Sequence, residues 1–199
     1  MSNSKRVLDL FGAACGLVFF APVMAAIAAA VWCGDRGPVL FRQARLGRGR
    51  RPFTILKFRS MRNGRVTPVG RLIRATGLDE LPQLVNVLRG EMSAVGPRPL
   101  TAEDVQRLGW TTPGHDFRWR SRPGLTGLAQ MACAGSGHAA LQLDRAYLEH
   151  RSLLLDCQLI ALSFAVNAFG KSLVRQFVNR ARLVTDALDE TAPGHSALS

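Results

Sequence analysis

An uninterrupted apolar segment near the N-terminus constrains this chain more than any other feature. Residues 10–33 are 24 consecutive residues without a charged side chain. As a helix rising about 1.5 Å per residue, the segment would be about 36 Å long, which is enough to cross the hydrocarbon core of a bilayer. The segment is too long for the apolar part of a secretory signal peptide, and no clear cleavage boundary follows it. It is therefore predicted to enter a membrane.

A proline and two groups of basic residues bear on how this segment lies in the membrane. Pro22 stands near its middle, where a proline removes a backbone hydrogen bond and kinks a helix. Lys5 and Arg6 precede the segment and several arginines follow it, and both residue types favour the cytoplasmic side. This arrangement favours a re-entrant helix that bends at Pro22 and returns. On the residues alone, a tilted span with a proline kink remains an equal alternative.

The positive charge of the chain is concentrated in one stretch. Residues 36–74 contain twelve Lys or Arg and no Asp or Glu, which equals the whole net charge of +12. A solvated basic face is the simplest interpretation. Beside a membrane segment, the stretch would also attract anionic headgroups and phosphorylated substrates, each residue contributing about 1 kcal/mol near the surface. The cysteines and histidines show no spacing typical of a disulfide framework or a metal site.

The rest of the chain predicts an α+β fold that is mostly helical. Short strands are expected at residues 39–42 and 53–58, joined by a basic loop. Residues 94–99 indicate a short strand that runs into a Pro-Arg-Pro corner, and residues 122–127 indicate a tight loop. A helical region from residue 145 to about residue 178 is expected to pack on the core or to lie at the membrane interface.

An acidic pair, Asp79-Glu80, stands at the predicted start of an amphipathic helix. Residues 76–79 fit a capping box, and apolar residues recur at helical spacing through residues 81–88. Gly90 is placed to end this helix. Two acids at such a position could do no more than complement the helix dipole.

Arginines around the acidic pair allow a second interpretation. Arg71 and Arg74 precede the pair and Arg98 follows it, and a helix N-terminus with nearby arginines forms an anion site. Because a bare carboxylate repels a phosphate, carboxylates in such a site suggest a phosphate bridged by Mg²⁺. A carboxylate can also be the nucleophile in phosphoryl transfer. Spacing alone does not decide between these roles.

Short motifs along most of the chain, taken in order, closely resemble the bacterial sugar transferase family, the monotopic polyprenyl-phosphate phosphoglycosyl transferases. The chain resembles the small members that consist of the catalytic domain. The matching motifs are residues 5–9, Pro22, residues 37–43, 45–47, Phe53, residues 57–61, 78–84, 86–88, 92–93, 95–99, 122–130, 147–149 and 155–156.

The resemblance implies a reaction and roles for particular residues. Asp79 would attack the β-phosphate of a UDP-sugar, forming a covalent phosphosugar intermediate and releasing UMP, and polyprenyl (undecaprenyl) phosphate would then accept the sugar phosphate. Mg²⁺ would be required, with Asp79 as its ligand, and Glu80 would assist in positioning or proton transfer. Arg74 and Arg98 would bind phosphate groups. Further candidates, for which a structural role is equally open, are Lys57, Arg59, Glu149 and Asp156.

The resemblance also implies an organisation and a location. Residues 1–35 would form a re-entrant membrane helix broken at Pro22, and residues 36–185 a catalytic domain with interfacial amphipathic helices. This domain would lie on the cytoplasmic face of the bacterial inner membrane and act early in glycoconjugate or exopolysaccharide assembly, alone or as a homo-oligomer. Residues 186–199 lack periodicity and are expected to form a disordered tail.

Three positions depart from the family pattern. Ala21 precedes Pro22 where the family has serine, Gly77 replaces another serine, and residues 131–135 replace a polar Asn-Gly-Arg-like stretch. If residues 131–135 contact the nucleotide or the sugar, the choice of sugar donor could differ from that of other family members. The sequence does not identify the sugar.

Two other classes of protein compete with this interpretation. A membrane-anchored binding or scaffold protein would explain the basic stretch and the apolar segment, but not an acidic pair among arginines. A nucleic-acid-binding protein would fit the pI of about 11.2, but the membrane segment and the lack of a nucleic-acid-binding motif argue against it.

Overall fold

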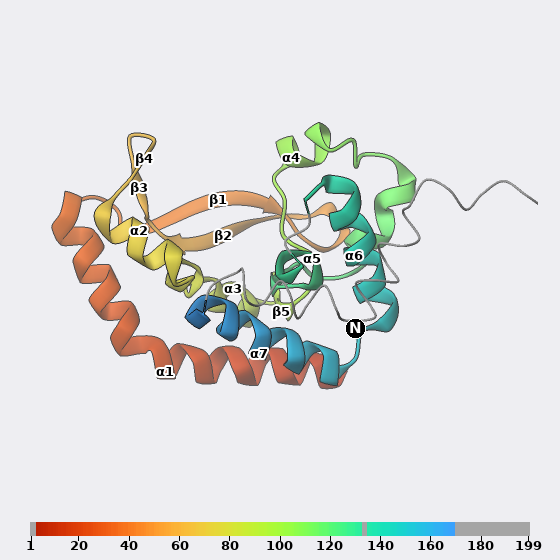
Figure 1. Cartoon of the computed structure of the whole chain (residues 1–199), viewed down its shortest axis with the longest axis horizontal. Coiled ribbons are helices and arrows are strands. Elements are labelled where there is room, and N and C mark those ends of the chain that lie inside the picture. The colour runs from red at the N-terminus through yellow and green to blue at the C-terminus, as the bar shows by residue number, and fades with distance from the viewer. Residues whose placement is uncertain (1–2, 133–134, 170–199) are drawn as a thin grey trace, which may run out of the picture.

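The computed structural model describes residues 3–132 and 135–169 (Figure 1). The chain is mostly helical with short strands, as the sequence predicts. The expected tail at residues 186–199, and the helical region beyond residue 169, lie outside the described residues. In chain order the elements are α1 (Asn3–Asp35), β1 (Leu40–Leu46), η1 (Arg48–Arg50), β2 (Pro52–Phe58), β3 (Met61–Arg62), β4 (Arg65–Val66), α2 (Pro68–Ala75), η2 (Leu78–Glu80), α3 (Gln83–Arg89), β5 (Ser93–Val95), α4 (Ala102–Arg107), η3 (Pro113–Arg120), β6 (Gly124–Thr126), α5 (Leu128–Met131), α6 (Gly137–His150) and α7 (Leu153–Phe169).

The apolar N-terminal segment is one long helix, α1, with Pro22 inside it. Figure 1 shows α1 running along one side of the molecule and then bending before it ends. The helix is long and apolar enough to cross a membrane, and only 11% of its most apolar window is buried inside the protein. In its first half Ala13 belongs to a buried cluster with Val87 of α3, whereas in its second half Ile27 clusters with Ile73 of α2. Both halves of α1 therefore pack on the same folded domain.

The two strands predicted around the basic loop form an antiparallel hairpin. Strand β1 pairs with β2 from Leu40 opposite Phe58 to Leu46 opposite Pro52. The first strand is longer than the sequence predicts, because the pairing with β2 continues to the loop. Arg45 is opposite Phe53, and Lys57 is opposite Phe41, so Arg45 and Lys57 lie on the same face of the hairpin.

The capping box predicted at residues 76–79 is wrong. The hydroxyl of Thr76 donates to the backbone oxygen of Leu72 at 2.9 Å, so it bonds to a carbonyl at the end of α2 and does not cap a new helix. Gly77 then reverses the chain with a φ of 69°, a left-handed conformation that favours glycine. The acidic pair therefore lies in the single turn η2, before α3.

Helix α3 begins at Gln83, three residues after the acidic pair. Gly90 ends it with a φ of 80°, as the sequence predicts. The guanidinium of Arg6 donates to the carbonyl of Val87 at 2.9 Å, and Nε of Arg122 donates to the carbonyl of Gly90 at 2.7 Å. Two arginines from distant parts of the chain thus donate hydrogen bonds to backbone carbonyls at the C-terminal end of α3.

Residues 122–127 are not simply a tight loop, because they contain strand β6, which pairs in parallel with β5. The strand predicted at residues 94–99 is present in part, as β5. A Cβ atom on Gly124 would lie 2.1 Å from the backbone nitrogen of Gly96, so the two segments approach more closely than any side chain allows. This pairing depends on a partner about 30 residues away in the sequence and has no local signal.

The C-terminal helical region consists of two helices within the described residues, where the sequence predicts one. Helix α6 begins earlier than predicted, capped by Ser136, whose hydroxyl accepts from the backbone nitrogen of Ala139 at 3.2 Å. The chain leaves helical geometry at Arg151, and α7 follows, with Oδ2 of Asp156 near its beginning 2.6 Å from Nζ of Lys5 in α1. A core formed by β5, α5, α6 and α7 supports the paired strands.

Candidate active site

The acidic pair lies where three elements meet. Turn η2 carries Asp79 and Glu80, β2 contributes Lys57 and the last turn of α2 contributes Arg74. The ammonium of Lys57 forms an ion pair with Oε1 of Glu80. The side chains of Asp79 and Glu80 are half-buried, whereas Arg74 is exposed. The structure therefore brings four of the predicted site residues together.

The environment of Asp79 disfavours its charged form. Burial raises the pKa of the Asp79 carboxyl, and the negative charge of Glu80 raises it further, while the positive charges of Lys57 and Arg74 oppose both effects. Desolvated carboxylates beside like charges are common where a protein uses a carboxylate in chemistry. Such a carboxylate would gain from a cation or from a covalent bond that removes its charge.

Arg98 lies at the Pro-Arg-Pro corner that follows β5, with its side chain exposed. Burial lowers the pKa of the Arg45 guanidinium, and the positive charge of Arg98 lowers it further. The negative charges of Asp104 and Glu80 raise it. Arg45 is thus within electrostatic reach of both Arg98 and Glu80, which connects the corner with the acidic pair. Sequence reasoning assigned no role to Arg45, although the motif at residues 45–47 contains it.

Arg59 lies at the end of the hairpin, where its guanidinium packs against Gly37. A Cβ atom on Gly37 would lie 2.2 Å from Nη1 of Arg59, so the glycine leaves room for this side chain. The backbone nitrogen of Arg59 also donates to the carbonyl of Val39 at 2.8 Å. These contacts attach Arg59 to the start of β1, and its role in binding phosphate stays a prediction.

Asp156 lies in a buried polar network. Nζ of Lys5 donates to Oδ2 of Asp156 at 2.6 Å, and the hydroxyl of Tyr147 donates to Oδ1 at 2.7 Å. In the same region Asp9 accepts hydrogen bonds from the hydroxyl of Ser93 and the backbone nitrogen of Ala94. The hydrogen-bond partners of Asp156 come from α1 and α6, which favours a structural role. Sequence reasoning quoted Lys5, Asp9 and Tyr147 as motif residues and missed that they form this network.

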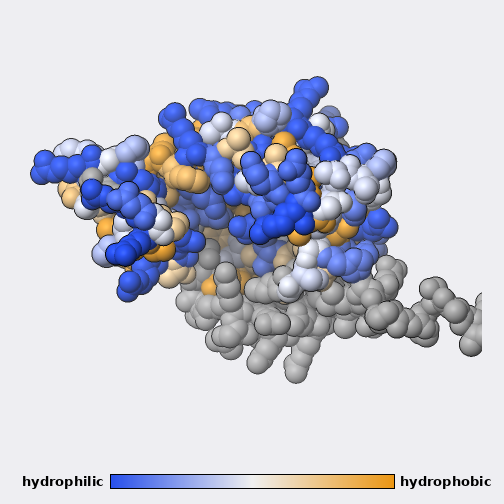
Figure 2. Space-filling model, turned by 90° about the horizontal axis from the view of Figure 1, so that it is seen from above, coloured by the Kyte–Doolittle hydropathy of each residue, from blue (hydrophilic) through white to orange (hydrophobic). Residues whose placement is uncertain are grey.

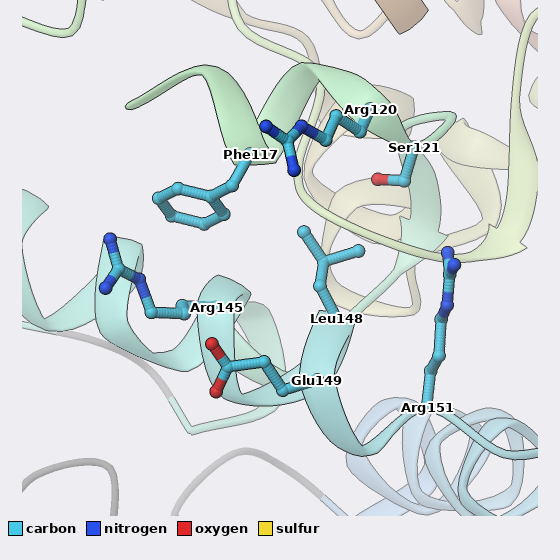
Figure 3. A pocket seen from close by; sticks show the side chains of 7 residues that line it. All are labelled: Phe117, Arg120, Ser121, Arg145, Leu148, Glu149 and Arg151. Atoms are coloured by element: carbon cyan, nitrogen blue, oxygen red, sulfur yellow. The ribbon is translucent and has the colours of Figure 1, made fainter. Parts of the chain in front are cut away.

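Glu149 lies in a separate pocket of about 290 Å³ between η3 and α6 (Figure 3). Neither Asp79 nor Glu80 is among the described residues that line it. The sequence offered no signal for this pocket, which only the packing of η3 on α6 creates. Its lining consists of Phe117, Arg120, Ser121, Arg145, Leu148, Glu149 and Arg151.

The acidic pair fits a Mg²⁺ ion that is shared with a substrate. Among the described residues there is no group of three or more His, Cys, Asp or Glu that could enclose a metal ion. Mg²⁺ at phosphate-transfer sites is commonly held by one or two carboxylates, with phosphate oxygens and water as the other ligands. Asp79, assisted by Glu80, offers this kind of partial donor set.

Comparison with known proteins establishes the class to which this fold and site belong. The family model described as bacterial sugar transferase matches residues 1–170, so the chain belongs to that family. A UDP-glucose:undecaprenyl-phosphate glucose-1-phosphate transferase of Caulobacter vibrioides is 44% identical over 155 residues, which are 71% of this chain and 58% of the relative. A UDP-N-acetylgalactosamine-undecaprenyl-phosphate N-acetylgalactosaminephosphotransferase of Aeromonas hydrophila is 37% identical over 78% of this chain and 41% of the relative.

Relatives of similar length also occur. The exopolysaccharide production protein ExoY of Rhizobium meliloti is 33% identical over 79% of this chain and 82% of the relative. The chain spans about half the length of the first three relatives, since the matched residues make up 58%, 41% and 41% of those proteins. The family membership and the long exposed apolar helix α1 together indicate that the protein associates with a membrane.

Proposed function

We propose that this protein transfers a sugar 1-phosphate from a UDP-sugar to a polyprenyl phosphate such as undecaprenyl phosphate. The observation that carries the proposal is the half-buried Asp79 beside Glu80, with the positive charges of Lys57 from β2 and Arg74 from α2 acting on it. The names of the relatives, which describe undecaprenyl-phosphate sugar phosphotransferases, support the same reaction. A binding or scaffold protein would not need a desolvated carboxylate in this position.

In the first step an oxygen of the Asp79 carboxylate attacks the β-phosphorus of the UDP-sugar. The bond between that phosphorus and the bridging oxygen breaks, and UMP leaves with the electron pair. The product is an acyl phosphate that joins Asp79 to the sugar phosphate. In the second step a phosphate oxygen of the polyprenyl phosphate attacks the same phosphorus. The bond to Asp79 then breaks, which restores the carboxylate and yields polyprenyl diphosphate sugar.

The residues around Asp79 have complementary tasks in this scheme. Asp79 would hold Mg²⁺, which supplies positive charge to the diphosphate when it is bound, and Glu80 would assist in positioning or proton transfer. Arg74 and Arg98 bind phosphate oxygens, and Arg offers paired donors for this purpose. Lys57 holds Glu80 in place through their ion pair and adds positive charge beside Asp79. In the acyl phosphate the half-buried carboxyl group of Asp79 carries no charge, and the remaining negative charge lies on the phosphoryl oxygens, where Mg²⁺ and the arginines would neutralise it.

The packing of α1 supports a re-entrant arrangement, and the basic residues at both ends of its apolar segment favour the cytoplasmic face of the membrane. A straight span would place the two ends of α1 on opposite sides of the bilayer. Both halves instead pack on the same domain, through Ala13 in the first and Ile27 in the second, and Pro22 lies between them. The face of the molecule viewed from above is mostly hydrophilic (Figure 2), while α1 lies along the opposite side in Figure 1.

The same arrangement suggests a contact of α7 with the membrane surface. Leu154 and Phe164 of α7 are 69% and 57% exposed, and Asp156 near the beginning of α7 pairs with Lys5 of α1. An apolar surface of this kind would be stable at the boundary between headgroups and acyl chains. The acceptor phosphate also lies at this depth, so the domain would meet it without removing the lipid from the bilayer.

The experiment that tests the proposed function is UMP release by purified protein in detergent. The assay contains Mg²⁺, undecaprenyl phosphate and one of a panel of UDP-sugars, including UDP-glucose and UDP-N-acetylgalactosamine. Release that requires lipid, Mg²⁺ and Asp79, and that is lost in Asp79→Asn, supports the proposal and identifies the donor. No release with any donor would favour the binding protein, and release that Asp79→Asn leaves unchanged would overturn the role of Asp79 in the mechanism.

A further inference from the structure

The Pro-Arg-Pro corner that carries Arg98 has most of its backbone carbonyls occupied by specific donors. The backbone nitrogen of Gly124 donates to the carbonyl of Pro97 at 2.9 Å. The backbone nitrogen of Leu46 donates to the carbonyl of Leu100 at 2.8 Å. The prolines on both sides of Arg98 restrict the backbone further. The corner is therefore a rigid support from which the exposed side chain of Arg98 projects.

The two carbonyls at the centre of the corner are each held by an arginine side chain. Nη2 of Arg118 donates to the carbonyl of Arg98 at 2.5 Å, and Nη1 of Arg45 donates to the carbonyl of Pro99 at 3.2 Å. These arginines come from η3 and β1, on different parts of the chain. Neither contact could be inferred from the local sequence of the corner.

Arg118 is an unusual residue for a merely structural contact because its charge is almost completely buried. Its side chain is 3% exposed, and Nε donates to Oδ2 of Asp144 at 2.8 Å. Its guanidinium also lies over the rings of Trp110, at 5.2 Å, and Trp119, at 5.3 Å. Burying such a pair has a large desolvation cost, and replacing it by apolar residues is often neutral or stabilising. A requirement for a fixed donor at the carbonyl of Arg98 would explain why a charged pair is present here.

Arg45 is held in a similar way from the other side of the corner. Its Nη2 donates to the side chain of Gln43 at 2.6 Å, and Nη1 lies 3.4 Å from Oδ2 of Asp104. Asp104 is itself fixed by a capping box with Thr101 at the start of α4. Each arginine therefore has an acidic partner that orients its guanidinium toward the corner.

We infer that Arg45 and Arg118 are positioning residues that clamp the Pro-Arg-Pro corner and so place the Arg98 guanidinium for the diphosphate of the donor. The inference rests on the proposed function, in which Arg98 binds a phosphate group. The physical reason is preorganisation, since a phosphate-binding donor that is already in place needs no reorganisation when the substrate arrives. A guanidinium that is displaced binds the diphosphate more weakly, so the loss should appear mainly as a higher KM for the UDP-sugar.

A double-mutant cycle tests whether Arg118 acts through Arg98. The enzyme is compared with Arg98→Gln, Arg118→Lys and the double variant, using UMP release with the donor found for the wild-type protein. Arg118→Lys keeps the charge but cannot donate to Asp144 and to the Arg98 carbonyl in the same geometry. We expect it to lower kcat/KM by about ten- to a hundredfold, mainly by raising the KM for the UDP-sugar. In the Arg98→Gln background the same change should cost less than about threefold.

A matched variant separates this effect from a general loss of structure. Arg50 also lies over the Trp119 ring, at 5.3 Å, and pairs with Asp116 at 2.7 Å, but its hydrogen bonds go to Trp110 and Thr111 and not to the corner. Arg50→Lys should leave the KM unchanged. A variant that only reduces the amount of folded enzyme lowers kcat at constant KM, and thermal unfolding of each protein measures that loss.

A second double-mutant cycle with Arg45→Lys and Arg98→Gln tests the same inference independently, including the case in which Arg118→Lys does not fold. It should show the same dependence on Arg98. The clamp would be overturned if the losses in kcat/KM of the single variants multiplied in both double variants with Arg98→Gln. It would also be overturned if kcat fell at constant KM. Either result leaves the proposed function in place. An inactive wild-type protein would overturn the proposed function itself and the clamp with it.

Discussion

Nζ of Lys5 lies 2.6 Å from Oδ2 of Asp156, so a single buried ion pair joins the beginning of α1 to the beginning of α7. The two side chains are 9% and 2% exposed, and Tyr147 donates a further hydrogen bond to the same carboxylate. Burial and the hydrogen bond to Asp156 raise the pKa of Tyr147, so its hydroxyl remains a donor at neutral pH. This contact attaches the membrane helix to the domain that carries the acidic pair.

Removing one partner of this ion pair should destabilise the protein strongly. Lys5→Ala leaves Asp156 buried with its negative charge uncompensated, at a cost of about 3 to 5 kcal/mol. Arg107→Ala is the control, because Arg107 forms an exposed pair with Asp104 that is worth no more than about 1 kcal/mol. Denaturant unfolding in detergent measures both. Equal losses in the two variants would contradict the importance of the buried pair.

Replacing Asp79 should abolish UMP release without lowering stability. Because burial and Glu80 raise the pKa of Asp79 in the folded protein, folding disfavours its charged form at pH 7. Asp79→Asn removes that charge, so the melting temperature should stay constant or rise. Thermal unfolding and UMP release are measured on the same preparation. A clear fall in the melting temperature would show that Asp79 is mainly structural.

The dependence of activity on pH should report the ionisation of Asp79. The carboxylate must be charged to attack phosphorus, so activity is lost as the pH falls through its pKa, which is raised above the ordinary range for aspartate. Lys57→Gln removes a charge that lowers this pKa, so the acidic limb of kcat/KM should move to higher pH. Glu80→Gln removes a charge that raises it, so the limb should move to lower pH. Shifts in the same direction would contradict this electrostatic arrangement.

The close approach of β5 and β6 should not tolerate a side chain at Gly124. A Cβ atom there would lie 2.1 Å from the nitrogen of Gly96 and 2.3 Å from the oxygen of Thr126, and neither backbone atom can move without breaking the strand pair. We expect Gly124→Ala to cost at least about 1 to 3 kcal/mol. Gly114→Ala has no atom within 4 Å and should change stability by less than about 0.5 kcal/mol. Unfolding midpoints measure the difference.

Labelling with a membrane-impermeable thiol reagent should distinguish a re-entrant helix from a spanning one. Cysteines introduced as Ser4→Cys and Gly34→Cys stand near the two ends of α1, in a protein whose four native cysteines are replaced by alanine. A re-entrant α1 predicts that both sites react in inverted vesicles and that neither reacts in intact cells. Reaction of one site from each side would establish a span and contradict the packing of both halves on one domain.

Much of this protein could be predicted from local patterns. The uncharged segment predicts a long apolar helix that enters a membrane, and the structure has one helix there that is mostly exposed. The alternation and turn residues around residues 40–58 determine a hairpin, and Gly90 determines the end of α3 because glycine readily adopts a positive φ. The order of short motifs was sufficient to identify the family and to single out Asp79 and Glu80.

Only the tertiary structure decided which distant groups meet. The hydroxyl of Thr76 could cap a following helix or satisfy the preceding one, and the packing of α2 selects the second. The sequence leaves a site role and a structural role open for Asp156, and only the fold brings Lys5, 151 positions away, into a buried ion pair with it. Arg45 and Arg118 reach the carbonyls beside Arg98 from separate elements. Local sequence determines which conformations and charges are available, whereas burial and long-range contacts determine their partners, because those contacts form only when the whole chain is folded.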